Sequence, residues 1–334
     1  MEELAHRTYT TFPEKENERK HHSLIRFNNE TRKILSVRNS IEYKDGTTSP
    51  PELIKFYQVN QNNTNALLNN YLWATNPLSF NDPFDFPIQL WEIDSFTRGN
   101  LLKILDAKAH CLLSDDEIYN LNIFRDIRIA TLGIICLHEG KETSQDILWG
   151  YYTNQKGFSI KFETHQLVQP WGEPFNVEYI EPQELNTFSL NEIETEDLFP
   201  MFLRWMTQKK DFWKVENEWR FIFPFLKGET LKMDAFPDER EKKYPLTAIK
   251  EISLGLKFFD DANTIQISDN NLYFIADSNM HQYQNQILTF LSDHQEIPVC
   301  HIFFQYDLEL HPRKCKVFKE KENRFLISYD NDTI

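Results

Sequence analysis

Short segments in which apolar and polar residues alternate recur along the chain and predict β-strands. Ile54 and Phe56 alternate with Lys55 and Tyr57, and residues 158–163 repeat the same period of two. Successive side chains of a strand point to opposite faces of a sheet, so this pattern is typical of strands with one buried face. Further strands are predicted by apolar runs at residues 129–137, 249–256 and 299–304. The first of these is apolar enough to be buried on both faces.

Apolar residues at helical spacing separate the predicted strands. Thr64 is the expected N-cap of a short helix that buries residues 66–68, and Ser144 begins a helix that ends near Asn154. Further helices are predicted at residues 91–109, 114–127, 199–206 and 280–291. The basic pair at residues 209–210 suits the C-terminus of the third of these. This mixture predicts an α+β fold with a mixed central sheet and flanking helices.

The first 50 residues differ from the remainder in charge. They hold nine Lys and Arg against eight Asp and Glu, whereas the whole chain has a net charge of -15. Apolar runs at residues 24–27 and 34–37 are out of place in a disordered tail. Ser49 and two prolines then indicate a boundary. We expect an N-terminal extension, residues 1–50, that docks on the main domain or on a protein partner, followed by a single domain at residues 51–334.

Composition narrows the class of protein. The chain has 334 residues, 40% of them hydrophobic, which is enough for a large core. Only nine glycines occur and there is no glycine-rich phosphate-binding motif, so the sequence argues against a dinucleotide fold of the glycine-fingerprint type. The acidic balance disfavours nucleic-acid binding. A basic cluster from Arg313 to Arg324 is expected to be a solvated tail, although Phe318 within it leaves an RNA contact open.

Cysteine usage and hydropathy bear on location. The four cysteines show neither paired nor zinc-binding spacing, so we expect free thiols, a reducing cytoplasmic location and no metal site. The N-terminus has no apolar signal region, and the longest apolar run, residues 129–137, is about half the length of a membrane span. No membrane association is expected.

The candidate chemistry begins with a charged triplet at residues 216–220. In a strand, Glu216, Glu218 and Arg220 share one face while the aromatic residues between and after them enter the core. Two carboxylates beside a guanidinium could orient a polar substrate and supply a base. The alternative is a solvated face with an ion pair worth roughly 0 to 1 kcal/mol.

A second candidate is the loop at residues 79–85. Its Asn81, Asp82 and Asp85 could bind a divalent metal or a ribose hydroxyl, but ordinary turn chemistry explains them as well. Tyr151, beside Trp149 on the predicted helix, could stack on a base, and a core-facing helix surface is the alternative.

These segments carry a resemblance to a family. The matching motifs are residues 54–57, residues 72–85, residues 148–153 with 156–162, and residues 216–220. Over roughly residues 53–256 the chain resembles the bacterial family named domain of unknown function 2971. The Ser-His pair that the family carries after its tryptophan is Gly150-Tyr151 here, and its usual arginine in the first strand is Tyr57. The family name implies a fold without an activity.

The order of elements is also similar to the layout of mono-ADP-ribosyltransferases. That layout implies NAD as cofactor, with Lys55 or Tyr57 in the early contact and Thr75 in the middle strand. It further implies that Glu218 or Glu216 stabilises an oxocarbenium-like ribosyl transition state, an interaction that strengthens as the cation develops.

The sequence therefore predicts an NAD-dependent ADP-ribosyltransferase-like enzyme, acting on a nucleotide ligand in bacterial antiphage defence or as a toxin. The alternative is a non-catalytic ligand-sensing or protein-binding module. Nucleic-acid action is a third and weaker hypothesis. The candidate catalytic residues are Glu216, Glu218 and Arg220, and the candidate cofactor-binding residues are Lys55, Tyr57, Thr75, Asn81, Asp82, Asp85 and Tyr151.

Overall fold

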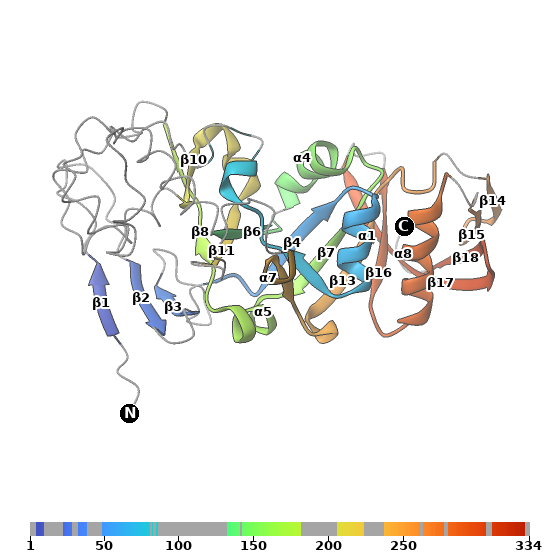
Figure 1. The fold of residues 1–334 in the computed structure, drawn as a ribbon. Helices are drawn as coiled ribbons and strands as arrows, with labels where there is room; N and C mark the ends of the chain where they lie inside the picture. The colour runs from blue at the N-terminus through green and yellow to red at the C-terminus, as the bar shows by residue number, and fades with distance from the viewer. Residues whose placement is uncertain are drawn as a thin grey trace, which may run out of the picture. The chain divides into compact units, whose positions relative to one another are not determined.

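The computed structural model forms two compact units, each built from separate stretches of the chain (Figure 1). It describes residues 5–9, 23–28, 33–38, 49–80, 82, 85, 132–140, 142–181, 206–223, 237–260, 263–276, 280–304 and 309–330. Unit 1 comprises Met1–Ser49, Trp73–Cys136 and Trp171–Lys242. Unit 2 comprises Pro50–Leu72, Leu137–Pro170 and Lys243–Ile334. The predicted helices at residues 91–109 and 114–127 lie outside the described residues.

Unit 1 contains small sheets. Strands β1, β2 and β3 form an antiparallel sheet within residues 1–50, and β9 pairs with β10 in parallel. Strand β11 lies between β6 and β8. The elements of this unit are β1 (Ala5–Tyr9), β2 (Ser23–Asn28), β3 (Lys33–Arg38), η1 (Pro77–Ser79), most of β6 (Gly133–His138), β8 (Phe175–Asn176), β9 (Glu178–Ile180), β10 (Gln208–Lys210), η8 (Asp211–Glu216), β11 (Glu218–Phe223) and α7 (Pro237–Arg240).

Unit 2 contains a long sheet in the order β14, β15, β18, β17, β16, β13, β7, β4 and the end of β6. Strands β13 and β16 run parallel, while the other described pairs are antiparallel. Its strands are β4 (Glu52–Tyr57), β7 (Phe158–Glu163), β13 (Ile249–Leu254), β14 (Asn263–Ser268), β15 (Asn271–Ile275), β16 (Val299–Phe304), β17 (Leu310–Lys321) and β18 (Arg324–Tyr329). The prediction of an α+β protein with a large mixed sheet is confirmed.

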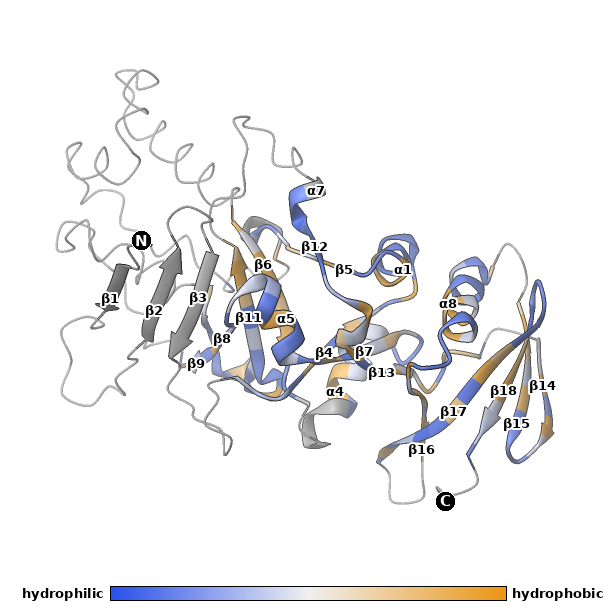
Figure 2. Cartoon of the chain, turned by 90° about the horizontal axis from the view of Figure 1, so that it is seen from below, coloured by the Kyte–Doolittle hydropathy of each residue, from blue (hydrophilic) through white to orange (hydrophobic). Residues whose placement is uncertain are grey.

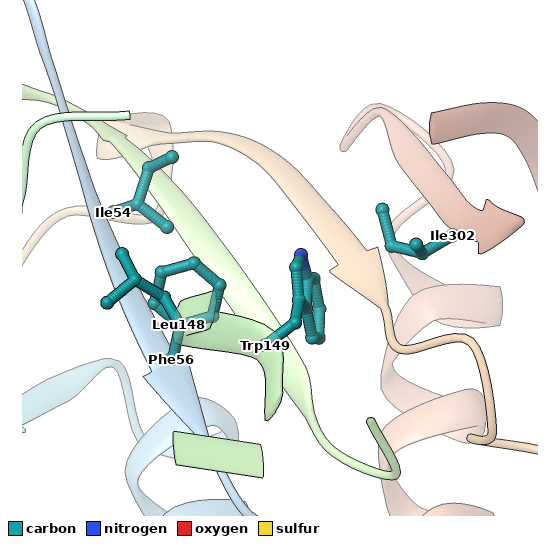
Figure 3. Packing of buried hydrophobic residues seen from close by; sticks show 5 residues of the cluster. All are labelled: Ile54, Phe56, Leu148, Trp149 and Ile302. Carbon is teal, nitrogen blue, oxygen red and sulfur yellow. The ribbon is translucent and has the colours of Figure 1, made fainter. Parts of the chain in front are cut away.

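Helices of unit 2 lie on both faces of its sheet. They are α1 (Gln61–Leu68), α4 (Glu142–Thr153), α5 (Thr164–Trp171) and α8 (Gln282–Asp293). Figures 1 and 2 show α1 and α8 on one side of the strands and α4 on the other. Trp149 of α4 packs with Phe56 of β4 and Ile302 of β16 (Figure 3). The short elements β5 (Tyr71–Trp73), β12 (Glu241–Lys243) and η9 (Leu246–Ala248) complete the described structure.

Local capping differs from the sequence prediction. Helix α1 begins after Asn60, whose side chain accepts a hydrogen bond of 2.9 Å from the backbone N–H of Asn63, and Thr64 is a buried residue inside the helix. Asn60 is an equally good N-cap type, and it lies one turn earlier. Helix α4 similarly begins at Glu142 and so includes Ser144. Both predicted N-caps were wrong, whereas both helices were right.

Three predictions for segments that form strands need correction. Tyr57 of β4 is buried together with Phe56, so this strand is buried on both faces. Residues 209–210 belong to β10 and do not end a helix. The basic cluster from Arg313 to Arg324 is a hairpin of β17 and β18 in which Cys315 and Val317 are buried. Its lysines occupy alternating exposed positions of a strand, which a count of charges alone does not reveal.

The remaining features concern helix length and thiols. None of the helices in the described part of the chain is long and apolar enough to cross a bilayer. Cys136, Cys300 and Cys315 are free thiols, the last two buried. Cys111 lies outside the described residues.

Candidate functional site

The charged triplet occupies the junction of two elements in unit 1 and not a single strand. Glu216 is the last residue of η8, and β11 starts at Glu218. Asn217 between them has φ 41° and ψ 56°, the left-handed conformation that asparagine tolerates better than most residues. This turn brings both carboxylates to Lys209 of β10, whereas neighbouring positions on one face of a strand would lie about 7 Å apart.

Lys209 is the centre of a buried charge cluster, which we define as Asp85, Lys209, Glu216, Glu218 and Arg220. Its Nζ atom lies 2.6 Å from Glu216 Oε2 and 3.0 Å from Glu218 Oε2. The same atom is 3.4 Å from Asp85 Oδ2. One ammonium group therefore contacts three carboxylates.

Arg220 links two of these carboxylates from the other side. Its Nε and Nη2 donate to Glu218 at 2.7 and 3.2 Å, a bidentate contact. Its Nη2 also donates to Asp85 Oδ1 at 2.7 Å, and Nη1 donates to the carbonyl oxygen of Met206 at 2.7 Å. The guanidinium group lies over the ring of Phe80, with 5.4 Å from its central carbon to the ring centroid. Every nitrogen of this side chain is thus used.

The charge cluster is almost fully removed from solvent. Arg220 is 0% exposed, Glu218 2% and Glu216 1%, while Lys209 and Asp85 reach 7% and 9%. The alternative of a solvated face with a surface ion pair is therefore wrong. Since three carboxylates face two cations, the ionised cluster carries a net charge of -1.

The two cations are held in their charged forms. Burial by itself would lower the pKa of Lys209, but the carboxylates of Glu218, Asp85 and Glu216 raise it well above its ordinary value. Burial likewise opposes ionisation of Arg220, and the charges of Glu218 and Asp85 raise its pKa. Burial raises the pKa of Tyr179, helped by the neighbouring charge of Glu218.

Two aromatic residues border the cluster. Tyr179 accepts a hydrogen bond of 2.8 Å at its hydroxyl from the backbone N–H of Glu218. The ring of Trp213 lies 5.2 Å from Lys209 Nζ, and its Nε1 donates to Asp82 Oδ2 at 2.8 Å. Asp82 therefore joins the border of the cluster through Trp213. Asn81, which stands between Phe80 and Asp82 in the sequence, lies outside the described residues.

The other predicted cofactor residues make the following described contacts. Thr75 exchanges two backbone hydrogen bonds of 2.9 Å with Ile134. In unit 2, Lys55 is half-buried on β4, and Tyr57 is a core residue stacked on Phe158 at 5.1 Å. Tyr151 is 52% exposed on α4. Tyr57 was predicted on the polar face of its strand. It is instead buried, which leaves little of its ring accessible to a ligand.

Sequence reasoning missed Lys209, Trp213 and Tyr179. No fixed spacing relates Lys209 to Glu218, because their contact depends on the pairing of β10 with β9 and on the turn at Asn217. The sequence neighbours of Lys209, from Thr207 to Asp211, are polar or charged, so no local signal distinguished it. Asp85 and Arg220 were both selected from the sequence, but their contact across 135 positions was not predicted.

The cluster is arranged for ion pairing more than for metal binding. Within the described ranges no group of three or more His, Cys, Asp or Glu side chains is placed to hold a metal ion.

The chain matches no protein-family model, and no similar protein is found among curated proteins or solved structures. The chemistry of the cluster is therefore the basis for any functional assignment.

Proposed function

We propose that the protein is an NAD-dependent ADP-ribosyltransferase-like enzyme whose centre is the charge cluster. One observation supports this: the three carboxylates of Asp85, Glu216 and Glu218 outnumber the two cations in a buried location. A negative charge fixed away from water stabilises a positive charge that develops beside it. Ribosyl transfer from NAD develops such a charge on the ribose.

Stability alone is a poor explanation for the cluster. Removing an ion from water costs several kcal/mol even after relaxation. Apolar residues of similar size in place of a buried ion pair often give the protein equal or greater stability. Strongly perturbed ionisable groups gather at functional sites more often than elsewhere. The pKa values of Lys209 and Arg220 are both perturbed, and their partners come from three separate parts of the chain.

The geometry favours an electrostatic role for Glu218 over a role as general base. Both of its carboxylate oxygens accept hydrogen bonds, Oε1 from Arg220 and Oε2 from Arg220 and Lys209. These three charge-assisted hydrogen bonds orient the carboxylate and occupy both of its oxygens. A base needs a free oxygen directed at the proton that it removes.

The same contacts support a second candidate, a non-catalytic ligand-sensing or protein-binding module. If Glu218 serves only Arg220 and Lys209, the cluster positions the loop that carries Asp82 and Asp85 as a recognition surface. In that case a partner could be bound through residues 1–50, whose three strands form a sheet of their own.

The test is incubation of the purified protein with NAD and a bacterial lysate, following nicotinamide release and the mass of labelled products. Glu218→Gln is the informative variant, and Glu251→Gln in unit 2 is the matched control for loss of one carboxylate. For the transferase we expect nicotinamide release that falls at least about 100-fold in Glu218→Gln and is retained in Glu251→Gln. Melting temperatures show whether each variant is folded.

The other outcomes separate the two candidates. A rise in melting temperature with NAD but no nicotinamide release would support the binding module. Release that persists in folded Glu218→Gln would remove Glu218 from the mechanism. If NAD is neither cleaved nor bound, both NAD-based assignments fail.

A further inference from the structure

Four apolar side chains form a row across the outer strands of unit 2. Ile265 of β14 pairs with Tyr273 of β15, which pairs with Leu326 of β18. Leu326 in turn pairs with Phe318 of β17. Directly paired residues lie on the same face of a sheet, so these four, the apolar row, are neighbours on one face.

The apolar row lies on the face that points away from the core of these strands. The alternate positions, Phe274, Phe325 and Ile327, are fully buried, and Phe274 packs against His281 at the start of α8. In contrast, Ile265 is 54% exposed and Phe318 41%. Helix α4 occupies the row's side of the sheet, but it packs over β4 and β16, at Ile302 (Figure 3). No described helix covers the row.

The row ends on an edge strand that carries neither a charge nor a proline. Strand β14 is the first strand in the sheet order, and Figure 2 shows it as the outermost strand of its unit. Its sequence, Asn-Thr-Ile-Gln-Ile-Ser, contains no charged residue and no proline, and residues 264–268 are all exposed. Ile267, at 52% exposure, is the extra residue where the register with β15 shifts between Gln266 and Ser268. Edge strands of soluble proteins are normally guarded by charges, prolines or bulges, since their free backbone groups pair with other strands. In β14 the irregularity lies at the end of the strand, and residues 263–266 keep a regular register.

We propose that β14 pairs antiparallel with β14 of a second copy of this chain, which joins the two sheets about a two-fold axis. The apolar row ends at Ile265 on the edge strand β14. A further strand that pairs with β14 would therefore extend the apolar row. The β14 of a second copy carries the same row, and antiparallel pairing of identical strands is self-complementary.

Charge also favours a second copy meeting at β14. Each chain carries a net charge of -15, so two copies repel one another over most of their surfaces. The six residues of β14 are uncharged and offer a contact without like charges directly opposite. Residual repulsion between the copies predicts that added salt strengthens the dimer.

The experiment is analytical ultracentrifugation of the full chain over a range of concentrations. We expect a concentration-dependent dimer in the wild type. In Ile265→Lys/Ile267→Lys the dissociation constant should rise at least about 10-fold, because two lysines per copy are placed beside the two-fold axis. Both sites are exposed, so folding should be retained, and an unchanged melting temperature at low concentration checks this.

Phe318→Lys is the matched control. It introduces one lysine into the same apolar row, three strands from the edge strand, and should leave the dimer intact. If the wild type stays monomeric at all concentrations, or if the double lysine variant dimerises as well as the wild type, the proposal is wrong. Loss of the dimer in both variants would mean that a partner covers the face of the row, which also contradicts edge pairing. Slow hydrogen exchange of β14 amides in the dimer provides a direct second readout.

Discussion

Arg220 shows how strongly one side chain can depend on its partners. It donates four hydrogen bonds within a fully buried site, three of them to Glu218 and Asp85. Because both carboxylates lie below 10% exposure, neither can regain water when the guanidinium group is removed. The arginine therefore shares with Lys209 the compensation of these two buried charges.

We expect Arg220→Ala to lower the free energy of unfolding by about 3 to 5 kcal/mol, since it leaves buried carboxylates without one of their two counter-ions. Urea denaturation measures the change. The control is Arg324→Ala, which removes an arginine whose pair with Glu320 is about one third exposed and should cost about 1 kcal/mol or less. Equal losses in the two variants would contradict the importance given to burial.

His301 predicts a dependence of stability on pH. Burial lowers its pKa from the ordinary 6.5 to about 4, against a smaller opposite effect of the backbone at Leu256 and Gly255. Its Nδ1 lies 2.9 Å from the hydroxyl of Tyr329. The unfolded chain binds the proton first as pH falls, so this residue costs no stability above pH 6.5 and destabilises the fold progressively from 6.5 down to 4.

The expected loss reaches about 3 kcal/mol below pH 4. In His301→Gln, the free energy of unfolding should fall less between about pH 7 and about pH 4.5 than in the wild type, measured by urea denaturation. His165→Gln, at a side chain that is 59% exposed, should follow the wild-type curve. Parallel curves for all three proteins would show that His301 does not titrate in this way.

At the scale of elements, two glycines on either side of one helix end should respond in opposite ways to the same substitution. A Cβ atom on Gly157 would lie 2.0 Å from the carbonyl oxygen of Tyr57 and 2.8 Å from Thr153 Cβ. On Gly150 inside α4, the nearest atom, at Gln155, would be 4.0 Å away. Strand β4 thus approaches Gly157 too closely for any side chain.

Gly157→Ala should lower the free energy of unfolding by at least about 2 kcal/mol, because backbone atoms must move. Gly150→Ala should raise it by up to about 1 kcal/mol through helix propensity. Thermal or urea denaturation of both variants measures the difference. A neutral result at Gly157 would be inconsistent with the close approach of β4 to the turn after α4.

The sequence predicted elements better than it predicted their partners. β16 was predicted with its true bounds, because its apolar run is continuous. The hairpin of β17 and β18 was missed, since lysines at alternating positions hide the buried Cys315 and Val317 between them. For the candidate site, four of the five cluster residues were selected from local motifs. Lys209 was not, because only the tertiary pairing of β10 directs it to Glu218.

At the scale of the whole molecule, charge is unbalanced. The chain has 51 acidic residues against 36 basic ones. Apart from the charge cluster, ion pairs of the described residues such as those of Lys161, Lys250 and Arg324 are partly exposed, so their charges interact with solvent and with other surface charges. An excess of negative charge destabilises a compact state through repulsion.

We therefore expect the melting temperature to rise as sodium chloride is increased from about 0.02 to about 0.2 M, where screening of exposed charges becomes effective. Differential scanning calorimetry measures it, and an equal concentration of an uncharged osmolyte corrects for changes in solvent alone. A melting temperature that falls with salt would mean that favourable surface ion pairs outweigh the repulsion.

The contact between Asp85 and Arg220 also has a consequence for the order of folding. These residues are 135 positions apart, and in the unfolded chain each is well solvated. Closing so long a loop is entropically unfavourable until other contacts hold its ends. Removing these charged groups from water becomes favourable only when the carboxylates and the cations of the cluster are already in contact. We expect the cluster to assemble after the rate-limiting step, so that it contributes to how slowly the protein unfolds and little to how fast it folds.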